Sequence, residues 1–330
     1  MQREKHSMKQ EITFSGKIKK ELARQWTEKR HCQIAEATAI ISMCGKVSID
    51  SREQYSVKVR TENISVAKKY FTLLRKTFNI KNEVLVSRNR NNGNVTYTVM
   101  IKNHDDAMRV LQETKLIDSK SEISEELSIG KNAIISHNCC KRAFIRGAFL
   151  AAGSMSNPEK SYHIEIVCAA SKKAEQLCAI INSFGLEAKV IVRKKTHVVY
   201  LKEGSQIVDL LNIMEASVAL MEMENVRILK EIRNSLNRQV NCETANINKT
   251  VSASVKQTED IQYIIDTVGL DELPEGLREI ARLRLEYKEA TLKELGDMVS
   301  TPLGKSGVNH RLRKISEIAE ELRQNREEEV

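Results

Sequence analysis

The pattern of apolar and polar residues repeats itself along much of the chain. Residues 33–45 form an apolar segment rich in small side chains that ends in Gly45, and this pattern predicts a helix. Residues 55–61 then alternate between apolar and polar side chains, as a half-buried strand does. A second small-residue helix is predicted over 141–153 and also ends in a glycine. Because similar elements follow both helices, we expect a duplicated α/β unit.

The two predicted copies follow a similar order of elements, with one strand fewer in the second copy. The first consists of helix 33–45, strands 46–50 and 55–61, helix 64–78, strands 83–88 and 94–102, and helix 104–115. The second consists of helix 141–153, strand 161–169, helix 172–184, strands 188–193 and 196–201, and helix 205–220. The pair Asn92-Gly93 is a strong hairpin signal and predicts that the strands beside it pair with each other.

The ends of the chain have a helical pattern. From residue 222 the apolar spacing first suits a long helix, which the polar stretch 241–256 either continues or interrupts. Shorter helices are predicted over 259–268, 275–287, 291–299 and 306–322, and the last three are the minimum set for a helix-turn-helix domain. At the other end, residues 13–26 suggest a basic leading helix around the lone Trp26, which we interpret as a packing anchor.

These elements predict the domain organisation of an α+β protein. We expect a duplicated α/β domain followed by an all-α helix-turn-helix domain. The expected domains are an N-terminal basic helical segment over 1–30, the duplicated domain over 31–220 (halves near 31–120 and 130–220), a helical linker over 221–258, and the helix-turn-helix domain over 259–330.

Composition and charge favour a polyanionic partner. The chain has 330 residues, 41% of them hydrophobic, and a formal net charge of +9, with a pI near 9.1. Nucleic acid is the first candidate for such a surface. The sequence contains no apolar run of about 18 residues and no secretory apolar core near its start. We therefore expect a cytoplasmic protein.

The cysteines do not follow a disulfide or zinc-finger spacing. Their number is seven, which is odd, and no CxxC motif occurs. His137 lies close to Cys139 and Cys140 in the sequence and could suggest a metal site. We prefer to interpret these cysteines as small buried thiols near a helix start. The expectation is therefore reduced thiols, no metal and no cofactor.

The two small-residue helices resemble the LAGLIDADG motif of homing endonucleases. In those enzymes two such helices pack side by side, and two four-stranded sheets form a saddle over DNA. An acidic metal ligand precedes the last glycine of each motif. Here Cys44 precedes Gly45 and Ala152 precedes Gly153. Neither side chain can hold Mg²⁺ at a phosphodiester, so we expect a DNA-shaped scaffold without hydrolysis.

The predicted saddle carries a basic surface on one half. Lys58 and Arg60 alternate with valines, so both charges share one face of a strand. We expect them to form a secondary DNA surface together with Arg88 and Arg90. In the second half, His163 and Glu165 share a face, and a glutamate there would oppose a phosphate. DNA contact, a protein-binding surface and a plain structural role all remain open for the saddle.

The helix predicted over 306–322 begins with a basic stretch and contains no acid among residues 305–314. Its inner stripe is expected at Val308, Leu312, Ile315, Ile318 and Ala319, with helical spacing. This arrangement suits a helix whose first half enters the major groove of DNA. Glu317, Glu320 and Glu321 lie further along, away from the groove.

Side-chain chemistry suggests a role for each residue of the basic stretch. Asn309, His310 and Arg313 are candidates for base contacts. Lys305, Ser306, Arg311 and Lys314 are candidates for phosphate contacts, and Ser306 could also cap the helix. Arg311 and Arg313 could exchange roles, because the sequence does not fix the rotation of the helix.

Three long strings of residues, 141–162, 237–250 and 305–315, resemble the WhiA family of bacterial regulators, and the resemblance covers nearly the whole chain. It implies a degenerate homing-endonuclease domain joined to a helix-turn-helix domain similar to region 4 of sigma factors. It also implies a sequence-specific transcription regulator linked to sporulation, cell division and chromosome segregation, with no established enzymatic activity. The role of residues 237–250 stays open.

The expected partner is double-stranded promoter DNA, with another regulator or a division protein as a second candidate and no membrane. We expect a nucleoid-associated monomer, although the sequence leaves the oligomeric state open. Two other functions are kept as alternatives: a metal-dependent DNA endonuclease, and an adaptor that binds protein instead of DNA. The operator sequence and the direction of regulation do not follow from the sequence.

Overall fold

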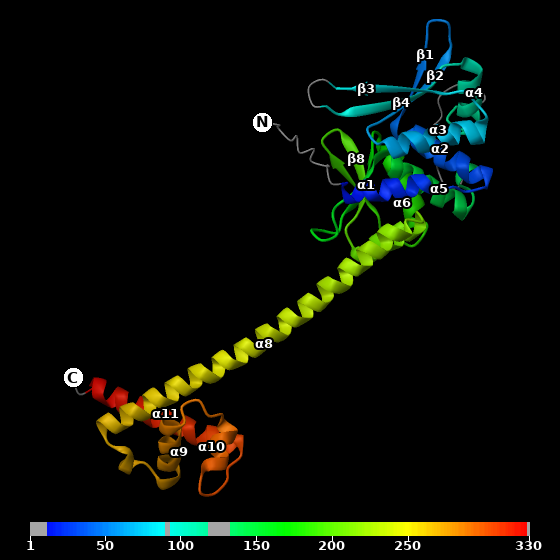
Figure 1. The fold of residues 1–330 in the computed structure, drawn as a ribbon. Coiled ribbons are helices and arrows are strands. Elements are labelled where there is room, and N and C mark those ends of the chain that lie inside the picture. The colour runs from blue at the N-terminus through cyan, green and yellow to red at the C-terminus, as the bar shows by residue number, and fades with distance from the viewer. Residues whose placement is uncertain (1–11, 90–92, 118–132, 329–330) are drawn as a thin grey trace, which may run out of the picture. The chain divides into compact units, whose positions relative to one another are not determined.

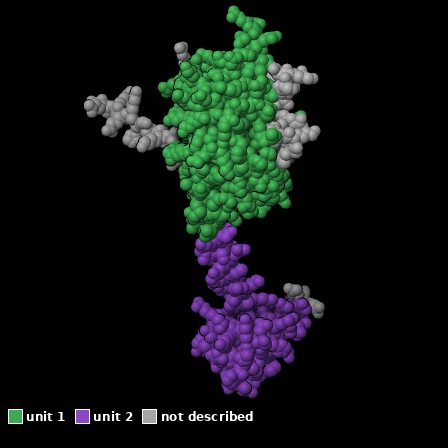
Figure 2. All heavy atoms as spheres, turned by 90° about the vertical axis from the view of Figure 1, so that its right-hand side faces the viewer, with its two compact units in different colours: residues 1–230 green, residues 231–330 purple. Residues whose placement is uncertain are grey.

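The computed structural model describes residues 12–89, 93–117 and 133–328 (Figure 1). The chain divides into two compact units, residues 1–230 and 231–330 (Figure 2). Among the described helices, none combines the length and the apolar character needed to cross a membrane. Arg90, predicted for the secondary DNA surface, and Asn92 of the predicted hairpin turn lie outside the described residues.

The first unit contains the predicted duplication. Its first half consists of α2 (Arg30–Cys44), β1 (Gly45–Ile49), β2 (Tyr55–Thr61), α3 (Ile64–Phe78), β3 (Glu83–Arg88), β4 (Val95–Ile101) and α4 (His104–Glu113). The second half consists of η1 (Ala133–Ile135), α5 (Asn138–Ala152), β5 (Gly153–Met155), β6 (Ile164–Cys168), α6 (Ser171–Asn182), β7 (Lys189–Arg193), β8 (Thr196–Leu201) and α7 (Gly204–Ile213). Both sheets are four-stranded, in the orders β1-β2-β4-β3 and β5-β6-β8-β7. The β3–β4 hairpin and the duplicated α+β fold are confirmed.

The small residues of α2 and α5 let the two helices run side by side (Figure 1). A Cβ atom added to Gly147 would lie 2.5 Å from the carbonyl oxygen of Glu36 and 2.9 Å from the Cβ atom of Ala39. Only glycine permits so close an approach of the two backbones. Each helix ends at a glycine that also begins a strand, Gly45 for β1 and Gly153 for β5.

A buried ionic network lies where α2, α3 and α5 meet. Glu36 is fully buried, and its Oε1 atom lies 3.3 Å from Lys69 Nζ and 3.4 Å from Arg146 Nε. Arg146 Nη1 also contacts Glu215 Oε2 at 2.7 Å, and Lys69 donates a hydrogen bond to the carbonyl of Gln25. These contacts tie both halves of the unit to one carboxylate.

Helix α1 (Phe14–Arg24) packs on the duplicated domain. Phe14, Ile18 and Leu22 are buried in a core built mainly by the second half, while Lys17, Lys20 and Arg24 are exposed on the outer side. Lys19 is half-buried, and burial lowers its pKa. Ser15 Oγ fixes the helix to β5, because it accepts a hydrogen bond from the N–H of Met155 at 2.6 Å. The predicted leading helix is therefore amphipathic and packs against the domain.

The prediction of one helix over 205–220 is wrong. Helix α7 ends at Ile213, and α8 (Ser217–Thr267) begins after a short break. Glu215 has a φ of 65°, and the N–H of Ala216 donates to the carbonyl of Leu211 at 2.9 Å, which closes the end of α7. The apolar spacing continued across this break and hid it. Helix α8 runs through the polar stretch 241–256, which therefore continues the helix.

The second unit is helical and is built around one apolar core. It contains the end of α8, η2 (Leu270–Glu272), α9 (Glu275–Glu286), α10 (Leu292–Met298) and α11 (Lys305–Glu328). Its fully buried or nearly buried side chains include Ile261, Ile264, Ile280, Leu295, Val308, Leu312, Ile315 and Ala319. The core thus joins the end of α8 to the three helices predicted for the helix-turn-helix domain.

Candidate nucleic-acid interface

The turn between α10 and α11 is held by local contacts that the sequence encodes. Thr291 and Glu294 form a reciprocal capping box at the start of α10. The carbonyl of Gly296 accepts a hydrogen bond from Leu303 N at 2.9 Å, and a Cβ atom at Gly296 would lie 2.1 Å from the Leu303 oxygen. Only glycine lets the turn close back on α10.

Helix α9 also holds this turn. A carboxylate oxygen of Glu279 accepts hydrogen bonds from Ser300 N at 2.6 Å and from Ser300 Oγ at 2.8 Å. These hydrogen bonds from Ser300 hold the pKa of Glu279 below its usual value. The position of the turn decides where α11 begins, so these contacts set the direction of the candidate recognition helix.

The buried stripe of α11 determines which side chains point outward. Val308, Leu312, Ile315 and Ala319 are buried in the core. Six of the predicted DNA-contacting residues are exposed: Lys305, Ser306, Asn309, His310, Arg313 and Lys314. The spacing of Ser306, Asn309, His310, Arg313 and Lys314 turns them away from the buried stripe, and Lys305 is exposed as the first residue of the helix. We call these six residues the outward face of α11.

Arg311 lies apart from the outward face. It is half-buried, and its Nη1 atom donates a hydrogen bond to the carbonyl of Gly276 in α9 at 3.1 Å. Arg313 is exposed and forms an ion pair with Glu317, with Arg313 Nε 3.2 Å from Glu317 Oε1. Because exposed pairs of this kind are weak, Arg313 can exchange Glu317 for another anion. The sequence left the rotation of the helix open. In the structure Arg313 faces solvent, whereas Arg311 contacts α9.

The first sheet of the duplicated domain carries a second basic surface. Lys58 and Arg60 are exposed on β2, while Val57 and Val59 between them are buried. Lys46 pairs with Lys58 in the β1–β2 ladder, so its exposed side chain lies on the same face. Lys46 was not predicted for this surface, because its face follows from the pairing of β1 with β2. We call Lys46, Lys58 and Arg60 the basic sheet face.

The strand register separates Arg88 from the basic sheet face. Arg88 pairs with Val95, whereas Arg60 pairs with Thr98, and side chains alternate between the two faces along β4. Arg88 therefore points to the side opposite Lys58 and Arg60.

The corresponding surface of the second sheet carries an acidic residue among its basic ones. Glu165 Oε2 lies 3.0 Å from His163 Nε2 and 3.1 Å from Arg193 Nη1. Burial alone would raise the pKa of Glu165, but the hydrogen bond from His163 and the charge of Arg193 hold it below its usual value. The carboxylate thus offsets the charge of Arg193, whereas Lys189, which pairs with Tyr200 beside Glu165, is exposed on the same face. An acidic group therefore interrupts the basic charge of this face.

The two degenerate motif positions offer no oxygen ligand for a metal. Cys44 donates a hydrogen bond from Sγ to the carbonyl of Ile40 at 3.3 Å. Burial raises the pKa of its thiol to about 11. Ala152 ends α5 and has no ligand atom in its side chain. Magnesium prefers oxygen ligands, and these two positions cannot provide them.

Three family models match the chain, and together they cover most of it. They are described as the WhiA N-terminal LAGLIDADG-like domain over residues 30–117, the WhiA LAGLIDADG-like domain over residues 141–233 and the WhiA C-terminal HTH domain over residues 236–319. The last of these matches includes the first turns of α11.

Relatives match over nearly their full length. The chain is 54% identical over 314 residues to a protein named "Probable cell division protein WhiA" from Lachnoclostridium phytofermentans, covering 95% of this chain and 100% of the relative. It is 49% identical over 318 residues to a protein of the same name from Alkaliphilus oremlandii, covering 96% and 99%. The crystal structure of full-length DUF199/WhiA from Thermatoga maritima matches with a TM-score of 0.57 and 24% identity, covering 94% of this chain and 98% of that one.

Proposed function

Since the chain belongs to the WhiA family, we propose that it is a sequence-specific DNA-binding regulator of transcription. The observation that carries this proposal is the outward face of α11. It presents amide, imidazole, hydroxyl and cationic groups to solvent. Within α11, the first acidic residue is Glu317. A helix of this kind can enter the major groove with its first turns while its buried stripe stays on the protein.

The outward face can combine base contacts with phosphate contacts. Asn309 and Arg313 are spaced by four residues and so lie one above the other on the helix. An asparagine can read adenine and an arginine can read guanine by paired hydrogen bonds, and His310 lies beside them. Lys305, Ser306 and Lys314 flank this group and suit phosphate oxygens. Arg311 is assigned a structural role against α9 instead.

The basic sheet face supports a second, weaker contact with DNA. Lys46, Lys58 and Arg60 can attract phosphates without reading sequence. The second sheet should attract phosphates less, because the Glu165 carboxylate contacts His163 and Arg193 and adds a negative charge to its surface. We assign sequence recognition to α11 and non-specific attraction to the basic sheet face. The regulated genes would serve cell division, sporulation and chromosome segregation, and the protein would associate with the nucleoid.

The phosphate role of Lys314 predicts a change in salt dependence. Lys314→Ala should weaken binding to every DNA duplex and lower the slope of log affinity against log salt by about one unit. The measurement is fluorescence anisotropy of the full chain at several salt concentrations, on a duplex that the protein selects from a random library. Lys256→Ala is the matched control, since this exposed lysine pairs with Glu320 in the same unit. An unchanged slope for Lys314→Ala, or equal slopes for both variants, would contradict the assignment.

The absence of carboxylates at Cys44 and Ala152 predicts that the chain does not cleave DNA. Supercoiled plasmid incubated with the full chain and Mg²⁺ or Mn²⁺ should stay supercoiled. Cys44→Asp and Ala152→Asp, introduced together, provide a comparison in which ligand oxygens are restored. The proposed function would be wrong if the parent chain nicked the plasmid in a metal-dependent way and this activity stayed with the protein through successive purification columns. The chain would then be an endonuclease.

A further inference from the structure

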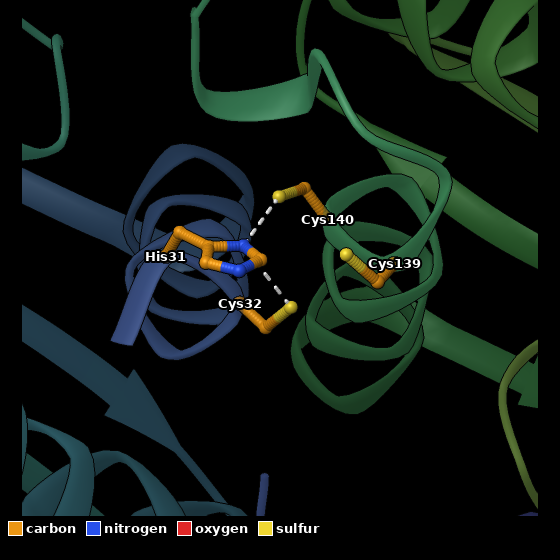
Figure 3. A group of neighbouring side chains, drawn as sticks. All are labelled: His31, Cys32, Cys139 and Cys140. Carbon is orange, nitrogen blue, oxygen red and sulfur yellow. Dashed lines mark hydrogen bonds between the residues drawn. The ribbon is translucent and has the colours of Figure 1, made fainter. Parts of the chain in front are cut away.

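Four side chains with metal-ligating atoms meet at the first turns of α2 and α5 (Figure 3). His31 and Cys32 come from α2, and Cys139 and Cys140 come from α5. Their ligand atoms all lie within 4.8 Å of one another. His31 Nδ1 is 3.0 Å from Cys140 Sγ and 3.4 Å from Cys32 Sγ. The cluster lies at the opposite ends of the two helices from Gly45 and Gly153.

The cluster follows from the duplication of the domain. His31 and Cys139 precede Gly45 and Gly153 by the same number of residues, and so do Cys32 and Cys140. Because α2 and α5 pack side by side, equivalent positions of the two copies meet. The histidine suggested by the local sequence, His137, is not part of the cluster. It precedes α5, and its ring stands edge-on to that of His31, with the centroids 5.8 Å apart.

Three sulfur atoms and one imidazole nitrogen are a common ligand set for structural zinc. In a tetrahedral site with zinc–sulfur bonds of about 2.3 Å, the sulfur atoms lie roughly 3.8 Å apart. The separations in the cluster, at most 4.8 Å, are close enough for side-chain rotations to reach this geometry. Cys32 and Cys140 are buried, whereas His31 is exposed and Cys139 is half-buried. The buried thiols would anchor the ion, and the exposed side gives it a path of entry.

The electrostatic setting also suits a cation held by thiolates. The first turns of α2 and α5 contain no acidic residue. Two helix N-termini place their partial positive charges beside the sulfur atoms, which offsets part of the cost of burying thiolates there. A bound divalent cation would displace one proton to solvent from each of the three thiols, and each sulfur would then donate an electron pair to the metal.

We propose that His31, Cys32, Cys139 and Cys140 form a structural site for one Zn²⁺ ion. The ion would join the first turns of α2 and α5, and therefore the two halves of the duplicated domain. This site is independent of the proposed DNA contacts, because α11 belongs to the other compact unit. A closed set of four protein ligands leaves no open position for catalysis.

The test uses the full chain, kept reduced and free of chelators, with Zn²⁺ and Co²⁺ as probes. We expect one equivalent of zinc by elemental mass spectrometry. We also expect one equivalent of Co²⁺ to give thiolate-to-metal charge-transfer bands and the intense visible bands of tetrahedral cobalt. Cys32→Ser and Cys139→Ser should lose both signals. The matched controls are Cys178→Ser and Cys242→Ser, because these free cysteines lie outside the cluster and should keep both signals.

A variant at the exposed ligand keeps the test falsifiable if the buried variants fail to fold. His31→Ala removes an exposed side chain, so its circular dichroism should match the parent. Its cobalt affinity should fall by more than the about 10–100-fold that loss of an outer-shell partner costs. Equal metal uptake by the parent, His31→Ala and Cys32→Ser would overturn the proposal. A thiol titration of the parent, purified without reductant, freed of metal and denatured, should find all seven cysteines as thiols. A count of five would also overturn the proposal if Cys32→Ser gave six, because it would reveal a disulfide in place of the metal site.

Discussion

Replacing Glu36 by alanine is expected to lower the free energy of unfolding of the first unit by about 3–5 kcal/mol. Glu36 is fully buried and is the carboxylate shared by Lys69 and Arg146, whose side chains are 2% and 4% exposed. Without it, two cations remain in a dry interior with too few anionic partners. A buried charge that has lost its partner is far more costly than an exposed one.

The pH dependence of the Glu36→Ala variant distinguishes this cause from a loss of packing. Burial lowers the pKa of Lys69, while the charge and hydrogen bond of Glu36 raise it. Removing Glu36 therefore lowers the folded-state pKa of Lys69 further. Over a wider pH range the unfolded chain then binds more protons than the folded one, so the stability of the variant rises with pH. This rise occurs below the ordinary lysine pKa of about 10.4 and should begin at a lower pH than in the parent.

Trp26 provides the measurement, because it is the only tryptophan in the chain and lies in the first unit. Its ring lies 5.3 Å from Lys69 Nζ and 4.9 Å from Lys76 Nζ, beside the network. Urea unfolding followed by its fluorescence reports the first unit. Glu222→Ala is the control, since it breaks an exposed pair with Lys17 and should cost less than about 1 kcal/mol. Equal losses for the two variants would show that the buried network is not a main source of stability.

Replacing Asn309 and Arg313 together by alanine is expected to weaken specific DNA binding by about 2–6 kcal/mol, from about 1–3 kcal/mol for each base contact. Both side chains are exposed on the outward face, and the four-residue spacing directs them to neighbouring bases. Arg313 can leave Glu317 at little cost, because both side chains of this pair are exposed. Binding to unrelated DNA should weaken less, because Lys305, Ser306 and Lys314 stay in place.

The double variant is tested by competition between a selected duplex and an unrelated duplex of the same length. The affinity ratio of the two duplexes should fall sharply, while circular dichroism stays that of the parent. Arg282→Ala is the matched control, because it removes an exposed arginine from α9 in the same unit. If the control lost as much discrimination as the double variant, the loss would reflect net charge and not recognition by α11.

Local sequence patterns were sufficient for most of the fold. The alternation over 55–61 correctly placed Val57 and Val59 inside and Lys58 and Arg60 outside, because a strand directs successive side chains to opposite faces. The break before α8 was missed for a physical reason. Apolar residues continue on both sides of it, and it depends on the left-handed conformation of Glu215, which this residue type does not signal.

The candidate interface was predicted in part. The spacing of Val308, Leu312 and Ile315 correctly predicted the buried stripe of α11. The same spacing indicates that Arg311 is half-buried beside this stripe. Arg311 follows Val308 by three residues and precedes Ile315 by four, which places it beside the buried stripe. Arg88 and Lys46 could not be placed, since their faces depend on which strands pair and in which register.

The cysteine and histidine cluster could not be recognised from local spacing, because its two halves come from helices far apart in the sequence. The signal was present in the duplication. Superposing the two copies on Gly45 and Gly153 aligns His31 with Cys139 and Cys32 with Cys140. Aligning two repeats can therefore reveal contacts between the copies that the spacing of residues within one copy does not reveal.

The central claim is that the outward face of α11 reads DNA sequence, and selection from a random duplex library tests it most directly. The full chain and the Asn309→Ala, Arg313→Ala double variant are each used to enrich bound duplexes, which are then sequenced. We predict that the parent enriches one defined motif and that the double variant loses preference at base pairs within it. If both proteins enriched the same motif with the same base preferences, recognition would reside elsewhere in the chain and the claim would be wrong.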